Sequence, residues 1–349
     1  MLTSFIKLVD GPSLAGNPTE APEAAPRVMT LETLLRLLEE VRKVRRGGAT
    51  LVWCGGELTS LGLPFFAEAV RLADATLGKS SVVHHLHTRG SSLDGDWANF
   101  LKARRVLVTL RLDGPEELHE AHHVTAYGPG SHRAARRALR LLKSRDVTLR
   151  VLCLLSSLSV PSADALLGYF ATIGVPEVEF VPLLQSGGNS PVPAIQAREY
   201  GSVMTRVFED WSERKGAPRV NLFLGLERRL AGRQSTVCRL EGRCARYITF
   251  ECDGNVYPCE EFAGVSEYYL GNVREENLLS MLRGPRARNC WKSWQTIPRA
   301  CRSCRWQSLC RGGCPLERWR AGNGEQEPSL LCEGLKMLYE HMAEVAAKA

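Results

Sequence analysis

The sequence predicts an α/β protein in which a partial (β/α)6 TIM-like barrel is followed by a small cysteine-rich domain. Over the first two-thirds of the 349 residues, short β-branched runs alternate six times with helical patterns. This rhythm stops near residue 226, and ten of the twelve cysteines lie between Cys238 and Cys332. Consecutive βα units imply a parallel sheet with helices outside, and crossovers of one hand roll it into an open barrel. We therefore expect a barrel domain at residues 1–226 and a second domain at residues 227–349.

Apolar patterns of period two and period 3.6 place the elements of the barrel. Strands are expected at Leu2–Val9, Leu51–Trp53, Ser81–Leu86, Val106–Leu112, Val147–Leu155 and Val178–Leu183. Helices are expected at Leu31–Val44, Leu63–Leu77, Asp96–Ala103, Ser131–Ser144, Ser162–Ile173 and Ala194–Glu213. Pro12–Val28 is rich in Pro, Ala, Gly and Glu, which is typical of a loop. Val220–Leu224 is expected to add an edge strand.

The second domain is predicted to contain little regular structure. A hairpin of Ile248–Phe250 and Val256–Tyr257 is expected, because the turn residues Asp253-Gly254-Asn255 lie between the two runs. Loops rich in cysteine, tryptophan and arginine follow, and Leu331–Ala346 is expected to close the chain as a helix.

Composition is ordinary for a water-soluble globular protein, with 44% apolar and 24% charged residues. No apolar run is long enough for a membrane span, and no signal peptide is recognisable, so we expect a cytoplasmic location without membrane partners. In a reducing compartment, twelve cysteines indicate metal ligands or catalysis rather than disulfides. The net charge of +7 is modest. The arginines of 133–145 are expected on a solvated helix face, which makes nucleic acid an improbable partner.

The cysteine spacing carries the strongest signal. Eight cysteines fall at spacings that suit two sites of four thiolates: Cys238, Cys244, Cys259, Cys301, Cys304, Cys310, Cys314 and Cys332. A site of four thiolates suits either a [4Fe–4S] cluster or a zinc ion. No role is assigned to the remaining four cysteines, Cys54, Cys153, Cys252 and Cys290.

This pattern resembles the SPASM domain, the twin-cluster extension of many radical S-adenosylmethionine (AdoMet) enzymes. Asp253-Gly254-Asn255-Val256-Tyr257-Pro258-Cys259, Leu309-Cys310-Arg311-Gly312-Gly313-Cys314-Pro315 and Leu331-Cys332-Glu333-Gly334 are similar to the anaerobic sulfatase maturase branch. The resemblance implies two [4Fe–4S] clusters. It implies that Cys238, Cys244, Cys259 and Cys314 hold the first cluster, and that Cys301, Cys304, Cys310 and Cys332 hold the second.

The resemblance extends to the barrel, with one large departure. Trp53-Cys54-Gly55-Gly56-Glu57-Leu58-Thr59 is similar to the family's Gly-Gly-Glu strand end, which implies that Gly55, Gly56 and Glu57 are what remains of an AdoMet site. Radical AdoMet enzymes also need Cys-x3-Cys-x2-Cys after the first strand. Here Pro12–Glu20 follows that strand and contains no cysteine. Ser, Asn and Glu do not replace thiolates in such a cluster. AdoMet is therefore expected not to be bound.

Two further groups of residues could carry chemistry. Seven of the eight histidines lie between His84 and His132. Six of them could line the barrel mouth, either as a metal site or as partly buried or cleft-facing side chains: His84, His85, His87, His119, His122 and His123. Glu260 follows Cys259 where the maturases place a catalytic Asp. It is either a relic base or a solvated acid, so no catalytic residue is assigned firmly.

These observations lead to a functional hypothesis with two alternatives. The missing motif predicts a catalytically degenerate pseudoenzyme with no radical AdoMet activity of its own. Such a protein would serve an intact radical AdoMet maturase, or bind its precursor peptide, as a partner subunit. The first alternative is an electron-transfer iron–sulfur protein serving such a partner. The second is an enzyme of another chemistry at the histidine-rich barrel mouth.

Overall fold

A computed structural model describes residues 2–11, 26–123, 130–185, 191–322 and 326–348. The chain divides into two compact units, each built from several segments. The first unit contains residues 1–111, 130–149 and 244–292, and the second contains residues 112–129, 150–243 and 293–349. The predicted domain boundary between residues 226 and 227 stays a prediction. None of the described helices is both long and apolar enough to cross a membrane.

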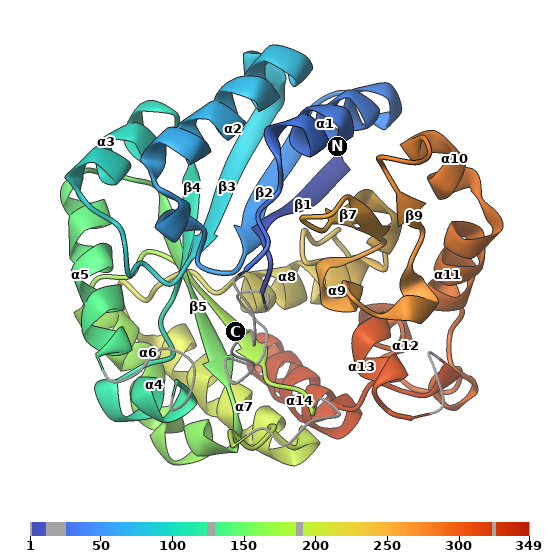
Figure 1. The fold of residues 1–349 in the computed structure, drawn as a ribbon. Helices are drawn as coiled ribbons and strands as arrows, with labels where there is room; N and C mark the ends of the chain where they lie inside the picture. The colour runs from blue at the N-terminus through green and yellow to red at the C-terminus, as the bar shows by residue number, and fades with distance from the viewer. Residues whose placement is uncertain (1, 12–25, 124–129, 186–190, 323–325, 349) are drawn as a thin grey trace. The chain divides into compact units, whose positions relative to one another are not determined.

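The first unit is a sheet with helices along it. Its strands follow the order β4-β3-β2-β1-β7-β8-β9. Their bounds are β1 Leu2–Val9, β2 Ala49–Gly55, β3 Val82–Thr88, β4 Leu107–Arg111, β7 Tyr247–Phe250, β8 Asn255–Tyr257 and β9 Gly271–Asn272. The helices are α1 Leu31–Val44, α2 Leu63–Leu77, α3 Gly95–Ala103, α5 Ser131–Ser144 and α10 Leu278–Arg283, with the start of α11 Pro285–Gln295. Figure 1 shows α1, α2 and α3 following one another along these strands.

The parallel pairing of β1, β2, β3 and β4 confirms the predicted βα rhythm in this unit. Strand β2 is buried along its whole length, as a strand covered on both faces must be. The core beside it contains the aromatic side chains of Trp53, Phe66 and Trp97, with ring centroids 5.3–6.0 Å apart. On α5 the buried positions are alanine and leucine, and Arg133, Arg137 and Arg140 are exposed, as expected for a solvated face.

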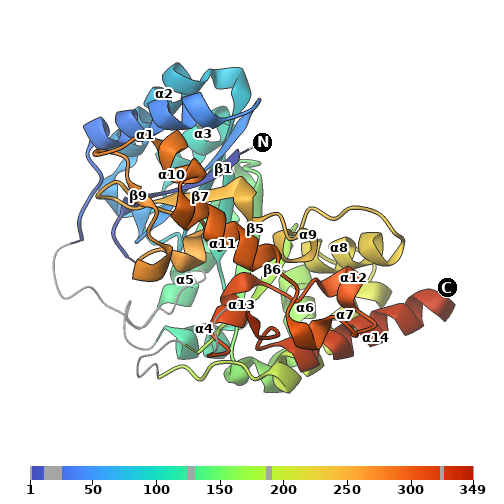
Figure 2. The same cartoon turned by 90° about the vertical axis from the view of Figure 1, so that its right-hand side faces the viewer.

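The sheet continues past the barrel strands into the cysteine-rich part of the chain. β7 pairs with β1 in parallel, placing Phe5 opposite Thr249, and β8 and β9 follow in antiparallel pairing. The predicted hairpin is therefore present as β7 and β8. Helix α10 lies beside α1 (Figure 2). Periodicity alone did not predict that this hairpin extends the barrel sheet.

The second unit packs helices on a parallel strand pair. β5 (Leu149–Leu155) and β6 (Val178–Pro182) pair in parallel. The helices are α4 Glu116–His122, α6 Ala163–Thr172, α7 Ala197–Glu213, α8 Asn221–Leu230, α9 Cys238–Glu241, α12 Gln307–Cys310, α13 Pro315–Trp319 and α14 Cys332–Lys348. Figure 2 shows α6, α7 and α14 side by side. Gly201 and Gly334 let α7 and α14 approach closely, because a Cβ on Gly334 would lie 1.9 Å from the Ala197 carbonyl oxygen.

Helices α10, α11, α12 and α13 lie where loops were predicted, and two earlier elements also differ from the prediction. The edge strand expected at Val220–Leu224 is wrong, because Val220 is the N-cap of α8. Phe223 and Leu226 are buried three residues apart, which is the helical period, and a five-residue window is too short to separate it from a strand. Helix α4 was missed, although Glu116 and Glu117 in its first turn are a helix-start signal. Pro12–Ala25 of the predicted loop lie outside the described residues.

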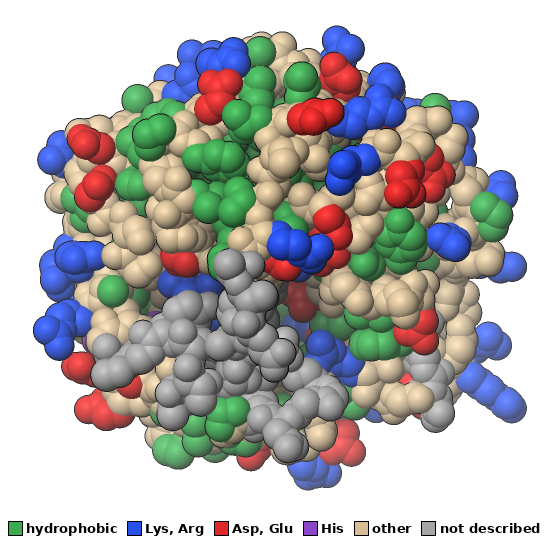
Figure 3. Space-filling model, viewed as in Figure 1, with side chains coloured by type: hydrophobic (Ala, Val, Ile, Leu, Met, Phe, Trp, Pro, Cys, Tyr) green, Lys and Arg blue, Asp and Glu red, His purple; other side chains and the backbone are tan. Residues whose placement is uncertain are grey.

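The surface carries mixed charge. Figure 3 shows Lys and Arg side chains interspersed with Asp and Glu over the described part of this face. Such a surface is typical of a solvated protein exterior.

Candidate iron–sulfur sites

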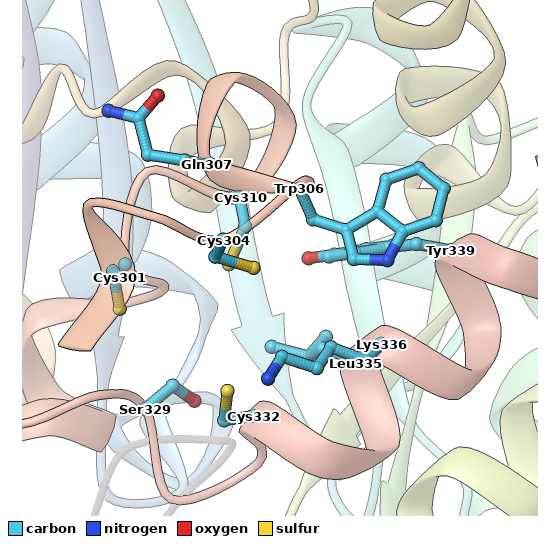
Figure 4. Close-up of a pocket in the computed structure, with 11 residues that line it drawn as sticks. Cys301, Cys304, Trp306, Gln307, Cys310, Ser329, Cys332, Leu335, Lys336 and Tyr339 are labelled. Carbon is cyan, nitrogen blue, oxygen red and sulfur yellow. The ribbon is translucent and has the colours of Figure 1, made fainter.

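Four predicted ligands line one pocket in the second unit. They are Cys301, Cys304, Cys310 and Cys332, and Figure 4 shows them around a common space. Cys301 ends a 3-10 helix, and the Cys304 amide donates to its carbonyl, so the two thiols lie on a single turn. Cys310 ends α12 and Cys332 begins α14. The pocket therefore gathers four thiols from three separate points of the chain.

Electrostatics in this pocket favours a bound cation or cluster. Burial raises the pKa of Cys301 and of Cys332, and the charges of neighbouring thiolates raise both further. Four thiolates in such a space repel one another unless a positively charged centre neutralises them. Soft thiolate donors in a set of four fit a [4Fe–4S] cluster. That these residues hold a cluster stays a prediction.

The other predicted ligand group is divided between the two compact units. Cys244 and Cys259 belong to the first unit, and Cys238 and Cys314 belong to the second. In the second unit, Arg239 lies beside both cysteines and forms an ion pair with the Glu317 carboxylate. Burial acts to lower the pKa of Arg239, but Tyr200, Cys314 and Cys238 outweigh it and raise that pKa. A permanent positive charge therefore lies next to two predicted cluster ligands.

In the Gly55-Gly56-Glu57 segment, a close backbone approach constrains Gly55 and hydrogen bonds hold the Glu57 carboxylate. Gly55 has a φ of +111°, and a Cβ there would lie 2.0 Å from the Val9 carbonyl oxygen, so only glycine fits. Glu57 is engaged by hydrogen bonds: its Oε1 accepts from the hydroxyls of Thr59 (2.5 Å) and Thr88 (2.6 Å). Its Oε2 accepts from the Arg89 backbone amide at 2.8 Å. The predicted relic site is thus a closed hydrogen-bond network, and its role stays a prediction.

The cluster that holds AdoMet in radical AdoMet enzymes does not fit the residues present. No cysteine occurs in residues 1–53. The next two, Cys54 and Cys153, are fully buried within β2 and β5. A strand thiol with no exposed surface cannot supply the three neighbouring thiolates that this cluster needs.

The histidines gather around a buried carboxylate that the sequence did not single out. Asp113, His119 and His123 each place one ligand-type atom within 4.8 Å of the others. The His119 Nδ1 accepts from the Asp113 backbone amide at 3.0 Å, so its other nitrogen carries the proton and has no lone pair for a metal. The Asp113 carboxylate accepts from the Leu154 amide at 2.8 Å. This favours the buried-network interpretation over the metal site.

Glu260 lies in an enclosed environment in the first unit. Its Oε1 atom is buried and has no hydrogen-bond partner among the described residues. Burial above all, and then Glu261, raise the pKa of Glu260 to about 7, while the Lys7 charge and the Cys54 thiol act in the opposite direction. Burial also raises the pKa of Cys54, so that thiol keeps its proton. Glu260 is therefore an acid–base group that titrates near neutral pH.

Comparison with known proteins places these features in a family context. Residues 238–305 match the SPASM model, described as an iron–sulfur cluster-binding domain. The cysteine-type anaerobic sulfatase-maturating enzyme of Clostridium perfringens is 26% identical over 90% of this chain and 86% of its own length. The serine-type enzyme of Bacteroides thetaiotaomicron is 24% identical over 92% and 82%.

Solved structures agree with the predicted fold. Native anSMEcpe with bound AdoMet and the Cp18Cys peptide superposes with a TM-score of 0.85 at 25% identity, covering 99% of both chains. Streptococcus suis SuiB bound to precursor peptide SuiA gives a TM-score of 0.69 at 13% identity, over 95% of this chain and 76% of that chain. The α/β fold with a parallel sheet, followed by a SPASM domain, is thereby confirmed.

These matches correct the functional hypothesis. Homology over nine-tenths of the chain to maturating enzymes overturns the degenerate partner subunit, and with it the electron-transfer and histidine-site alternatives. The missing cysteine motif misled the prediction because that motif concerns only one local segment. The fold of the chain and its cluster-binding domain at residues 238–305 are retained. The chain carries a SPASM iron–sulfur cluster-binding domain and is homologous to the anaerobic sulfatase-maturating enzymes.

Proposed function

We propose that this chain is an iron–sulfur enzyme of oxidoreductase type that acts in the maturation of a peptide or protein substrate. The observation that carries the proposal is the match to maturating enzymes along nine-tenths of the chain. Two structures of similar fold, anSMEcpe and SuiB, contain bound peptides, which supports a peptide as substrate here.

The proposed cofactors are two [4Fe–4S] clusters. Cys301, Cys304, Cys310 and Cys332 are assigned to one, supported by the pocket that they line. Cys238, Cys244, Cys259 and Cys314 are assigned to the other, supported by the SPASM match alone. When bound, such clusters accept and release single electrons, which an oxidative maturation requires.

Glu260 is the residue proposed to accept a proton from the substrate. A carboxyl with a pKa of about 7 is partly ionised at neutral pH and can both accept and return a proton. Its enclosed Oε1 atom has no competing hydrogen bond in the described part of the chain. Loss of a general base typically lowers a rate by about 10²–10⁴-fold.

The test is oxidation of a peptide by anaerobically reconstituted protein. Cysteine- and serine-containing peptides are incubated with reductant and AdoMet, with this chain alone and with an intact radical AdoMet maturase added, whose reductive cleavage of AdoMet supplies the oxidant. The mass of the modified side chain is measured. Glu260→Gln should lower the rate of product formation about 10²–10⁴-fold while retaining peptide affinity. Glu267→Gln, at an exposed position of the same unit, is the matched control. No product beyond that of the added maturase alone, with both clusters loaded, would refute the proposal.

Four finer proposals accompany this function. AdoMet binding is expected to be weak, because Glu57 is already engaged and the residues after β1 lack thiolates. The chain alone is expected not to release 5′-deoxyadenosine, and tight AdoMet binding or its cleavage would overturn both statements. An intact radical AdoMet maturase as partner, and a cytoplasmic location, stay predictions. Co-purification with such an enzyme, and product only in its presence, would support the partner.

A further inference from the structure

Helix α14 presents a predicted cluster ligand and two polar groups on one face. Cys332, Lys336 and Tyr339 stand at positions i, i+4 and i+7, a spacing that aligns side chains along a helix. All three line the pocket of the four thiols. Figure 4 shows the Lys336 amine extending toward Cys332, and the Tyr339 hydroxyl pointing toward Cys304 and Cys310.

Tyr339 is fixed in place and keeps its proton. Its side chain is 2% exposed and packs edge-on against the Trp306 ring, with centroids 5.9 Å apart. Its hydroxyl lies inside the pocket, directed at the Cys304 and Cys310 sulfurs (Figure 4). A neutral phenol hydroxyl beside a thiolate is a hydrogen-bond donor to the sulfur.

Lys336 places a positive charge beside another sulfur. The Lys336 amine lies on the same face of α14 as Cys332 and extends toward that sulfur within the pocket (Figure 4). The Lys336 side chain itself is exposed, so salt in the solvent will screen its charge.

We propose that Tyr339 and Lys336 set the reduction potential of the cluster held by Cys301, Cys304, Cys310 and Cys332, and that both raise it. Reduction adds one electron, whose charge is spread over the cluster and its thiolate sulfurs, with no bond made or broken. A donor at the Cys310 sulfur and a cation near the Cys332 sulfur stabilise the reduced form more than the oxidised form. This inference rests on the proposed cluster assignment.

The test is a potentiometric titration of the anaerobic protein with dithionite, followed by electron paramagnetic resonance. The signal of this cluster is the one that a Cys301→Ala variant lacks. Tyr339→Phe should lower the equilibrium constant for reduction about tenfold, or ~59 mV for one electron. Lys336→Met should lower it about threefold at low salt, and less at high salt.

Matched variants separate electrostatics from packing. Lys336→Arg keeps the charge and should keep the potential. Lys348→Met, on the same helix beyond the pocket, and Tyr169→Phe on α6 should leave it unchanged. The inference is overturned if Tyr339→Phe and Lys336→Met both stay within about twofold of the wild type. It is also overturned if Lys336→Arg shifts as far as Lys336→Met.

Iron analysis distinguishes a wrong cluster assignment from a wrong role for Tyr339 and Lys336. Wild-type protein without iron in this pocket would refute the cluster assignment itself. Wild-type protein with full iron and unmoved potentials in the variants would refute only the role of Tyr339 and Lys336. If Tyr339→Phe fails to retain iron, the potentials of Lys336→Met, Lys336→Arg and Lys348→Met still test the inference. These lysine side chains are exposed, so their replacement should not prevent folding.

Discussion

Replacing Glu40 with alanine tests how the SPASM region is attached to the barrel helices in the first unit. Glu40 lies on α1 with its side chain fully buried. Its carboxylate accepts from Lys43 Nζ at 2.7 Å and from the Leu278 backbone amide at 2.9 Å, and Arg36 lies 3.2 Å away. Leu278 is the first residue of α10, within the SPASM match. One carboxylate thus joins residues 238 positions apart.

The loss of unfolding free energy expected for Glu40→Ala follows from the groups that lose Glu40 as a partner. Without Glu40, the Leu278 amide remains buried with no acceptor, which costs about 1–3 kcal/mol. The Lys43 and Arg36 side chains are 52% and 40% exposed, so water can solvate them and each loses only about 0–1 kcal/mol. The total for Glu40→Ala is therefore about 3 kcal/mol. Glu40→Gln keeps an acceptor oxygen and should lose about half of that.

The assay is urea unfolding together with hydrogen exchange of the α10 amides, with Glu39→Ala on the same helix as the control. Burial acts to raise the pKa of Glu40, but Lys43, the Leu278 amide and Arg36 outweigh it and lower the pKa. Its charge-dependent stabilisation is therefore complete above the usual value of 4.5 and is lost as the pH falls through the lowered value. There the wild type should approach Glu40→Gln but stay more stable than Glu40→Ala, because a neutral carboxyl still accepts from the Leu278 amide. A Glu40→Ala loss below about 0.5 kcal/mol, or an equal loss in Glu39→Ala, would refute the reasoning.

Three further predictions concern the clusters, the helix packing and the base. Cys301→Ala should reduce bound iron from about eight to about four atoms per chain, and unchanged iron would contradict the ligand assignment. Gly334→Ala should disrupt the contact of α14 with α7, because the added Cβ would overlap the Ala197 carbonyl oxygen. This variant should lose both stability and bound iron. The control Ala346→Gly, near the end of α14, should change iron retention little. The folded-state pKa of Glu260, about 7, exceeds its usual 4.5, so ionisation opposes folding. Between those values the wild type should lose up to about 3 kcal/mol as the pH rises, and Glu260→Gln should not, as urea unfolding at about pH 5 and about pH 8 would measure.

Local patterns determined most of the helices and strands. Leu2–Val9, Leu31–Val44, Leu63–Leu77 and Ser131–Ser144 have the bounds that periodicity predicted. The cysteine spacing identified the ligand candidates, since a metal site limits the residue types that can serve it. Where a run was short, as at Val220–Leu224, the window contained too few residues to separate the two periods, and α8 was taken for a strand.

Other features depend on contacts between distant segments, which periodicity does not encode. An apolar face shows that an element is buried, but not which element covers it, so the pairing of β7 with β1 and the capping of Leu278 by Glu40 were invisible in the sequence. The closed network around Glu57 and the buried Asp113 beside His119 and His123 likewise exist only in the folded chain. The sequence by itself determined which residues could carry the iron–sulfur chemistry. Only the tertiary structure decided what surrounds them, because the pKa of Glu260 and the positions of Tyr339 and Lys336 depend on burial and on neighbours far along the chain.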